Sequence, residues 1–325
     1  MRSYPKSVFL VIGLLLLTAC KPATALPLSA TATLMPTDMP TPTVLSQVSP
    51  SPLPPQPSLT PTEQPRPTAT QPAEIPAAPQ EVTFYAVDGQ ELHGLYYRAA
   101  VEPAPTVVLM HWVNGNQSDW YEIAVWLQNR GQANPFPLPG DSPWWDPTWF
   151  PALPADRSYA VFIFNFRTCE QANERCSLPF DQWGKFLLDA QAAMIKVREL
   201  PGVDVNNIVA IGSSIGADGA ANACFWLNAQ YPDSCRGALS LSPGGYLGIG
   251  YLEAVRKMSD PPLPVWCLAD ENENFVCDSA KQAKNPNYQA ITIPSGGHGN
   301  FLLRPNLQPL PMQLMIDFLY QATGR

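Results

Sequence analysis

The chain has 325 residues, and its 27 acidic and 19 basic side chains give a formal net charge of −8. An acidic chain with a pI near 4.9 lacks the positive field that holds a phosphate backbone, which excludes nucleic-acid binding as a leading function. Hydrophobic residues make up 46% of the chain, enough for a sizeable core, and its 38 prolines are about twice the usual share.

The first twenty residues combine a basic start with an apolar run of ten, from Val8 to Leu17. Ten residues are too few to cross a bilayer, which takes about twenty, but they suit the core of a signal peptide. The run ends in the sequence LTAC, which resembles the lipobox of bacterial lipoproteins. The resemblance implies that the Cys20 thiol receives a diacylglycerol. We therefore interpret residues 1–20 as a lipoprotein signal peptide, and expect an extracytoplasmic protein anchored by lipid to the bacterial cell membrane.

Residues 21–80 hold 16 prolines and ten threonines and contain no aromatic residue. Proline removes backbone donors, and such a segment cannot bury enough apolar surface to offset its ordering entropy. We therefore interpret residues 21–80 as a disordered tether between the anchor and a folded domain, with no part in catalysis.

From residue 81 onward the sequence alternates between apolar strands and amphipathic helices. Residues 81–97 are typical of a β-hairpin with its turn at Asp88-Gly89. The elements expected after it are, in chain order, strand 106–112, helix 119–131, strand 159–166, helix 181–200, strand 207–212, helix 215–228, strands 237–243, 264–270 and 288–294, and helix 312–322. Apolar strands that alternate with helices indicate a mostly parallel sheet covered on both faces. Residues 81–325 are therefore predicted to form one α/β domain.

One stretch, residues 132–156, breaks this alternation. It contains seven prolines together with Trp144, Trp145 and Trp149. A stretch of this length without regular structure inside a domain usually forms a functional loop. Either the three tryptophans contact substrate, or they only pack a surface loop against the domain. The sequence leaves both interpretations open.

Six cysteines remain once Cys20 is assigned to the anchor, and they fall in three local pairs. An even number in an exported chain favours disulfides. We predict that nearest neighbours are joined: Cys169–Cys176, Cys224–Cys235 and Cys267–Cys277. Zinc is the alternative, but the cysteines lack the CxxC spacing and the neighbouring histidines of a zinc site. We therefore expect no metal and no cofactor.

The sequence NIVAIGSSIG places a G-x-S-x-G pattern at Gly212, Ser214 and Gly216, directly after an apolar strand and before a helix of small residues. A serine on so tight a turn needs a glycine two residues away on either side, because a β-carbon there would meet the strand or the helix. The serine hydroxyl is then exposed above the carboxyl edge of the sheet. The N–H of Ile215, at the start of the helix, points toward the oxyanion that forms when the serine attacks a carbonyl. This pattern predicts Ser214 as a nucleophile.

A serine nucleophile needs a base, usually an imidazole, and the chain has three histidines. His93 lies in the first hairpin, and His111 ends a strand. His298 lies in the glycine-rich sequence SGGHGN after the last strand, where a base late in the chain can reach the serine. We therefore predict His298 as the base.

The acid that orients this base should lie between the serine and the histidine and follow a strand. The sequence CLADENENFVC meets this condition and offers three candidates, Asp270, Glu271 and Glu273.

At this point residues 81–325 resemble the α/β-hydrolase superfamily, most nearly its dienelactone-hydrolase-like and prolyl-oligopeptidase-type esterases. The segment ELPGVDVNNIVAIGSSIGADGA carries the resemblance. It implies an α/β-hydrolase fold in which residues 132–156 are an insertion. In that family the strand before the acid is commonly followed by the pattern small-x-E-x-D, and matching this pattern places Glu273 at the acid position. Asp270 stays open as the alternative acid.

The segment HWVNGNQSDW, residues 111–120, resembles the HGxGG-type oxyanion loop of the same family. The resemblance implies that Val113 supplies the second oxyanion N–H and that His111 is structural beneath it. Trp112 stands where the family has a glycine.

These observations predict a serine hydrolase that cleaves carboxylic esters through an acyl-enzyme. The expected substrate is a small-molecule ester, the expected membrane contact is the lipid anchor alone, and no nucleic-acid partner is expected. Two alternatives remain at this stage. One is a peptidase or acyl-transferase of the same fold, and the other is a non-catalytic surface protein that binds through its aromatic loop.

Overall fold

The computed structural model describes residues 74–140, 142–169 and 175–324, all of them within one compact unit. The predicted signal peptide, the lipidation site Cys20 and residues 21–73 of the predicted tether lie outside the described residues. Within these ranges no helix has both the length and the apolar character needed to span a bilayer.

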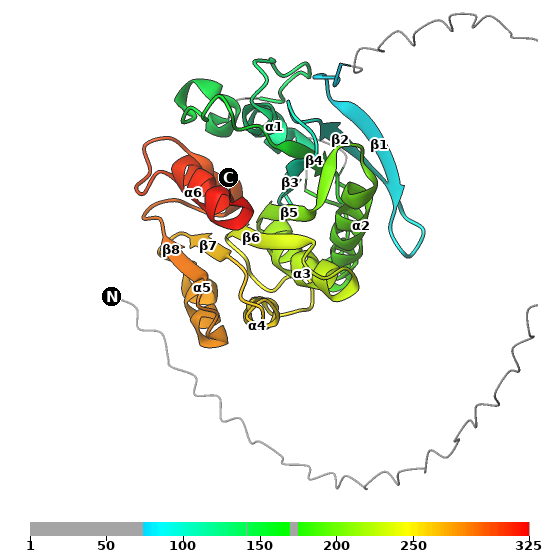
Figure 1. Ribbon diagram of the computed structural model, residues 1–325. Coiled ribbons are helices and arrows are strands. Elements are labelled where there is room, and N and C mark those ends of the chain that lie inside the picture. The colour runs from blue at the N-terminus through cyan, green and yellow to red at the C-terminus, as the bar shows by residue number, and fades with distance from the viewer. Residues whose placement is uncertain (1–73, 141, 170–174, 325) are drawn as a thin grey trace, which may run out of the picture. The chain divides into compact units, whose positions relative to one another are not determined.

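A sheet of eight strands organises the described chain (Figure 1). Its strands are β1 (Gln80–Tyr85), β2 (Glu91–Tyr97), β3 (Ala104–Met110), β4 (Ala160–Phe164), β5 (Val203–Ser213), β6 (Cys235–Leu241), β7 (Val265–Ala269) and β8 (Tyr288–Thr292). Their spatial order is β1-β2-β4-β3-β5-β6-β7-β8. The β1–β2 hairpin is antiparallel and β2 runs antiparallel to β4, whereas all neighbours from β4 to β8 are parallel. The parallel strands therefore end at one carboxyl edge, where their loops meet.

The α-helices of the described chain cover both faces of this sheet. They are α1 (Tyr121–Gln128), α2 (Lys185–Glu199), α3 (Ile215–Gln230), α4 (Tyr251–Lys257), α5 (Phe275–Ala280) and α6 (Pro311–Thr323). On β3, Val108 and Met110 belong to the core cluster that includes residues of α2 to α5, whereas Val107 and Leu109 belong to the cluster that includes residues of α1 and α6, the two helices on the other side in Figure 1. Because both faces are buried, the strand is a continuous apolar run. The expected mostly parallel sheet with helices on both faces is confirmed.

The differences from the expected elements lie at strand ends and in short helices. Strand β3 ends at Met110, two residues before its expected end, because the chain there turns into the loop described below. The helices α4 and α5 have seven and six residues, too few for their apolar periodicity to be recognised. The stretch 132–156 was expected without regular structure, but it contains two single-turn 3-10 helices, Pro143–Trp145 and Pro147–Trp149.

Disulfides join the six described cysteines in the nearest-neighbour pairs. Cys224–Cys235 ties α3 to the start of β6, and Cys267–Cys277 ties β7 to α5. Cys169–Cys176 lies in the segment that follows β4. The first and third of these disulfides therefore hold segments that follow the carboxyl ends of strands, whereas the second joins α3 to the amino end of β6.

The end of the predicted tether is held against the folded chain. The Arg130 guanidinium donates to the carbonyls of Ile75 and Pro76, and the Gln128 amide donates to the carbonyl of Ala77. These bonds fix the path by which the chain passes the end of α1 and enters β1.

Candidate active site

The chain makes a sharp turn between β5 and α3, with Ser214 at its tip. Ser214 has a φ of +55° and a ψ of −115°, a backbone conformation that a residue other than glycine adopts only under constraint. The turn depends on two close approaches: a β-carbon on Gly212 would collide with the carbonyl of Gly216, and one on Gly216 with the carbonyl of Met110. Strand, turn and helix therefore pack so closely that only glycine fits at the positions two residues before and two residues after the serine.

Two hydrogen bonds connect Ser214, His298 and Glu273. The His298 Nε2 atom lies 2.8 Å from Ser214 Oγ, and the Nδ1 atom lies 2.8 Å from Glu273 Oε2. With Nδ1–H donating to the carboxylate, Nε2 accepts from the serine O–H, which is the arrangement in which an imidazole takes up the serine proton. Ser214 is 2% exposed, whereas the side chains of His298 and Glu273 are 33% and 36% exposed. The serine is therefore nearly enclosed, whereas the histidine and the acid are partly open to solvent.

Asp270, the alternative acid, binds backbone amides instead of the imidazole. Its Oδ1 accepts from the Asn272 N–H at 2.9 Å, and its Oδ2 accepts from the Gly297 N–H at 3.0 Å. These donors stabilise the charged carboxylate and hold the pKa of Asp270 below its usual range. Asp270 therefore ties the turn that carries Glu273 to the loop that carries His298.

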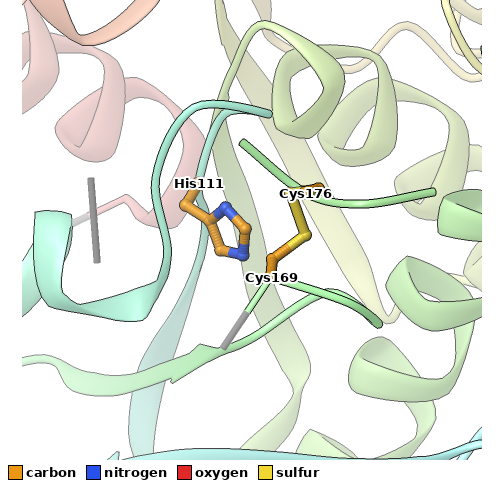
Figure 2. Close-up of side chains that lie close together, drawn as sticks. All are labelled: His111, Cys169 and Cys176. Carbon is orange, nitrogen blue, oxygen red and sulfur yellow. A yellow bond between two sulfur atoms is a disulfide. The ribbon is translucent and has the colours of Figure 1, made fainter. Parts of the chain in front are cut away.

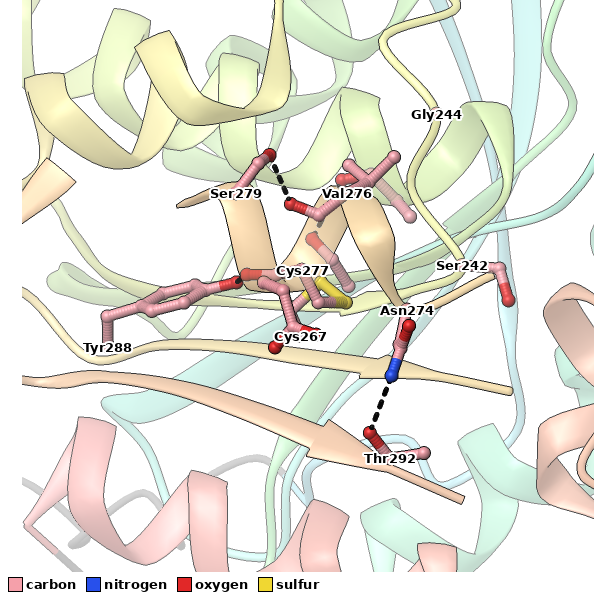
Figure 3. Close-up of a disulfide and its surroundings, with 12 residues drawn as sticks. Ser242, Gly244, Cys267, Asn274, Val276, Cys277, Ser279, Tyr288 and Thr292 are labelled. Atoms are coloured by element: carbon pink, nitrogen blue, oxygen red, sulfur yellow. Dashed lines mark hydrogen bonds between the residues drawn. A yellow bond between two sulfur atoms is a disulfide. The ribbon is translucent and has the colours of Figure 1, made fainter. Parts of the chain in front are cut away.

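The turn before α5, which carries the acid, is anchored to the sheet (Figure 3). The Cys267–Cys277 disulfide joins α5 to β7. Two residues of β8 also hold this segment. The Tyr288 hydroxyl donates to the carbonyl of Cys277 at 2.7 Å, and the Thr292 hydroxyl accepts from the Asn274 amide at 3.3 Å. Anchors on two neighbouring strands limit how far the acid can move away from the imidazole.

The loop that carries His298 depends on the glycine that follows the histidine. Gly299 has a φ of +61°, and a β-carbon there would lie 2.7 Å from Ser213 Oγ and 3.2 Å from the Trp112 ring. The Gly299 N–H donates to Ser242 Oγ at 3.0 Å. Glycine therefore lets the histidine loop pass directly over the nucleophile turn.

The loop after β3 contains the residues expected to complete an oxyanion site. His111 is fully buried, and its ring nitrogens lie 2.7 Å from the Trp112 carbonyl oxygen and 3.0 Å from the Phe166 N–H nitrogen. Burial lowers the pKa of His111 to about 4, so the ring is neutral at pH 7. Val113 follows in this loop, and Ile215 begins α3, where the first N–H groups have no partner within the helix.

The structure gives the Trp112 side chain its own packing site. The indole contacts the rings of Trp144 and Phe301 edge-on, at centroid distances of 6.4 and 5.4 Å. The Asp119 carboxyl lies beside the indole N–H, and burial raises the pKa of this carboxyl to about 8. The rings of Trp144 and Phe301 therefore accommodate Trp112, which stands where the HGxGG-type loop has a glycine.

Of the three tryptophans of the insertion, Trp144 reaches the loops around the serine. Trp144 contacts Phe301, which is three residues after His298 in the sequence, at a centroid distance of 5.7 Å. Trp145 packs on Trp144 at 5.9 Å, and Trp149 packs on Phe150 at 4.8 Å. Trp149 therefore packs within the insertion, whereas Trp144 connects it to the site.

Tyr246, in the loop after β6, is a site residue that the sequence analysis misses. Burial raises its pKa most, with smaller contributions from the Asp218 and Glu273 carboxylates, while the neighbouring Ser214 hydroxyl lowers it. The Tyr246 N–H donates to the Asp218 carboxylate at 2.8 Å, and the Gly245 N–H donates to the same group at 3.0 Å. Asp218 lies one turn after Ser214 on α3, so this loop is bound to the helix that follows the serine. The sequence offered one signal for this loop contact, which is Asp218, an acid placed within a helix of small residues.

His111, Cys169 and Cys176 form a group of metal-ligand types, with one ligand atom from each within 4.8 Å of the others (Figure 2). The two sulfurs are bonded to each other, and both imidazole nitrogens have backbone partners. In the disulfide-bonded state the group therefore offers a cation neither a cysteine thiolate nor an unpartnered imidazole nitrogen.

Comparison with known proteins finds no matching family and no matching characterised sequence. Among solved structures, the chain is similar to the α/β hydrolase GrgF from Penicillium sp. sh18, with a TM-score of 0.52 and 13% identity over 76% of this chain and 100% of the other. An esterase of Pyrococcus furiosus matches with a TM-score of 0.50 and 16% identity over 76% and 94%. A dienelactone hydrolase from Anabaena variabilis matches with a TM-score of 0.50 and 15% identity over 75% and 99%. The expected α/β-hydrolase fold is therefore confirmed.

Proposed function

We propose that the protein is a serine hydrolase that cleaves carboxylic esters through an acyl-enzyme. The observation that carries this proposal is the hydrogen-bonded chain from Glu273 through His298 to Ser214, in which both bonds are 2.8 Å long. The order of groups is a carboxylate, an imidazole and a hydroxyl on a constrained turn, and this order supports nucleophilic catalysis. The structures of similar fold include an esterase and a dienelactone hydrolase, which supports an ester as the substrate.

In the first half of the proposed reaction, Ser214 Oγ attacks the ester carbonyl carbon while His298 Nε2 takes the serine proton. Glu273 holds the Nδ1–H of the ring and stabilises the imidazolium that forms. The N–H groups of Ile215 and Val113 donate to the oxyanion of the tetrahedral intermediate. His298 then donates its proton to the departing alkoxide oxygen, so that an alcohol leaves and the serine stays acylated.

In the second half, water attacks the acyl carbon and His298 takes a proton from it. Collapse of the second tetrahedral intermediate breaks the bond to Ser214 Oγ, and the imidazolium returns its proton to this oxygen. The acid product leaves and the starting protonation states are restored.

We also propose that the enzyme works outside the cytoplasm, held to the membrane by a lipid on Cys20. The lipobox-like sequence LTAC supports the anchor. Three disulfides in the described chain support an oxidising compartment, because disulfides are rare where thiols are kept reduced.

A fluorophosphonate probe tests the proposed nucleophile. Wild-type protein should be labelled covalently, Ser214→Ala should not, and Ser213→Ala provides a matched control because it removes the neighbouring buried hydroxyl. Peptide mapping should place the label on Ser214. Absence of labelling in folded wild type, or equal labelling of Ser214→Ala, would contradict the proposal. Turnover of p-nitrophenyl esters of increasing acyl length, compared with the matched anilides, then separates an esterase from a peptidase.

A further inference from the structure

We propose that His111 and the Cys169–Cys176 disulfide are positioning elements for the Val113 amide. This inference rests on the proposed function, in which that amide is the second oxyanion donor. Neither His111 nor the disulfide contacts the reacting atoms in the proposed mechanism. Their effect would be exerted through the two peptide groups on either side of Val113.

The hydrogen bonds of His111 determine which ring nitrogen carries the proton. The Phe166 N–H donates to Nε2 at 3.0 Å, so Nε2 is an unprotonated acceptor. In a neutral imidazole the proton is then on Nδ1, which donates to the Trp112 carbonyl at 2.7 Å. Protonation of Nε2 would set two N–H groups against each other inside a fully buried site. His111 is therefore a fixed donor to the Trp112 carbonyl.

That carbonyl belongs to the same peptide group as the Val113 N–H. A trans peptide group is planar, so its C=O and N–H point in opposite directions. When His111 holds the Trp112 carbonyl, it therefore also fixes the direction of the Val113 N–H, which is aimed away from the imidazole. Loss of this hydrogen bond would free the peptide group to rotate.

The next peptide group is held from the other side of the loop. The Cys176 N–H donates to the Val113 carbonyl at 2.8 Å. Cys176 is bonded covalently to Cys169, whose own N–H donates to the Phe166 carbonyl at 3.2 Å.

Phe166 is also the residue whose N–H binds the imidazole. The contacts therefore close a ring that passes from Phe166 through His111 to the Val113 peptide groups, and back through the disulfide, which lies beside the His111 ring in Figure 2. The disulfide is the covalent part of this ring. Without it, the position of the Cys176 N–H would depend on local backbone contacts alone.

The first test removes the disulfide and compares it with another disulfide of the same chain. The double variant Cys169→Ser/Cys176→Ser is measured beside Cys224→Ser/Cys235→Ser, which lies between α3 and β6. Full loss of one oxyanion donor lowers kcat by about 10²- to 10³-fold, so a misplaced donor should lower it by about tenfold or more. The KM for a p-nitrophenyl ester should change by less than about twofold, because this donor acts mainly in the transition state.

A second test keeps one of the two hydrogen bonds of the imidazole at a time. In His111→Asn the amide nitrogen replaces Nδ1 as donor to the Trp112 carbonyl, whereas in His111→Gln a polar atom replaces only Nε2 as acceptor. Each variant leaves one backbone group without its partner, so their melting temperatures should be similar. His111→Asn should retain more kcat than His111→Gln, by about tenfold, and a boronic acid inhibitor should bind the two variants in the same order.

The outcomes separate this inference from the proposed function. If folded wild type neither hydrolyses esters nor reacts with the fluorophosphonate, the proposed function fails. If wild type is active and the Cys169→Ser/Cys176→Ser variant keeps the kcat of the Cys224→Ser/Cys235→Ser variant, the positioning role of the disulfide is refuted. If the cysteine variants do not fold, equal kcat and equal boronate affinity of the two His111 variants refutes the role of the imidazole.

Discussion

Replacing Glu273 by Gln should lower kcat strongly while leaving the fold intact. The substitution keeps the shape of the side chain but removes its charge and one acceptor oxygen next to His298 Nδ1. When the amide N–H faces this nitrogen, the ring proton moves to Nε2, which can then no longer accept from Ser214. Even with the amide oxygen facing the ring, the imidazolium loses the neighbouring negative charge.

Two reference values bound the loss. A hydrogen bond to a charged group contributes about 1.5–3 kcal/mol, which corresponds to about 10- to 150-fold in rate. In a Ser-His-Asp protease, where the acid is buried, the Asp-to-Asn change costs about 10⁴-fold. Here the side chains of His298 and Glu273 are 33% and 36% exposed, so water screens the charge and the ring can turn. We therefore expect Glu273→Gln to lower kcat by about 10²- to 10³-fold.

Asp270→Asn is the matched comparison, because it makes the same isosteric change three residues away. One carboxylate oxygen that accepts from the Asn272 or Gly297 N–H becomes an amide NH2 group, which cannot accept, and this costs stability by about 1–3 kcal/mol. The imidazole keeps its partner, so kcat should fall by less than about tenfold.

The assay compares kcat and KM of the two variants on one activated ester. Circular dichroism and melting temperature control for folding. The opposite ranking of kcat would assign the acid role to Asp270, and wild-type kcat in both variants would refute the triad.

Three further outcomes are expected, the first two from the structure and the third from the lipobox-like sequence. Gly299→Ala should abolish fluorophosphonate labelling, since the added methyl group would lie 2.7 Å from Ser213 Oγ; labelling at the wild-type rate would refute this. Asp119→Asn should flatten the pH dependence of Tm: the folded-state pKa of about 8 lies above the unfolded value near 4, so unfolding releases a proton and stability falls as pH rises between these values. Cys20→Ala should move the protein from the membrane to the soluble fraction with unchanged kcat, and a wild-type protein without lipid would contradict the anchor.

The turn at Ser214 was predictable because its main constraint, the close approach of Gly212 to Gly216, is local in the sequence. The glycines two residues before and after Ser214 contact its own strand and helix and the neighbouring β3, so the pattern in the sequence contains the cause of the geometry. The strands were predictable for a similar reason, since a strand buried on both faces is a continuous apolar run. With only three histidines in the chain, His298 followed from its glycine-rich setting and its place after the last strand.

The choice between the acids was not predictable from residues alone. Asp270 and Glu273 lie on one turn, and both follow β7 closely enough to reach a histidine. Their roles differ because Asn272 and Gly297 donate to Asp270, and Gly297 belongs to a loop 27 residues away. The same holds for Tyr246 and the Trp112 cluster, whose positions are determined by contacts between loops that are distant in the sequence.

Two of the buried acids in the described chain, Asp218 and Asp270, are bound in the same way. Asp218 accepts from the N–H groups of Gly245 and Tyr246, and Asp270 accepts from those of Asn272 and Gly297. Backbone amides thus bind both carboxylates, which hold loops in place at the carboxyl edge. Glu273 instead directs its Oε2 at the imidazole, and its side chain is 36% exposed. The proposed catalytic acid is therefore distinguished by the group that its oxygens contact, and burial alone would not have selected it.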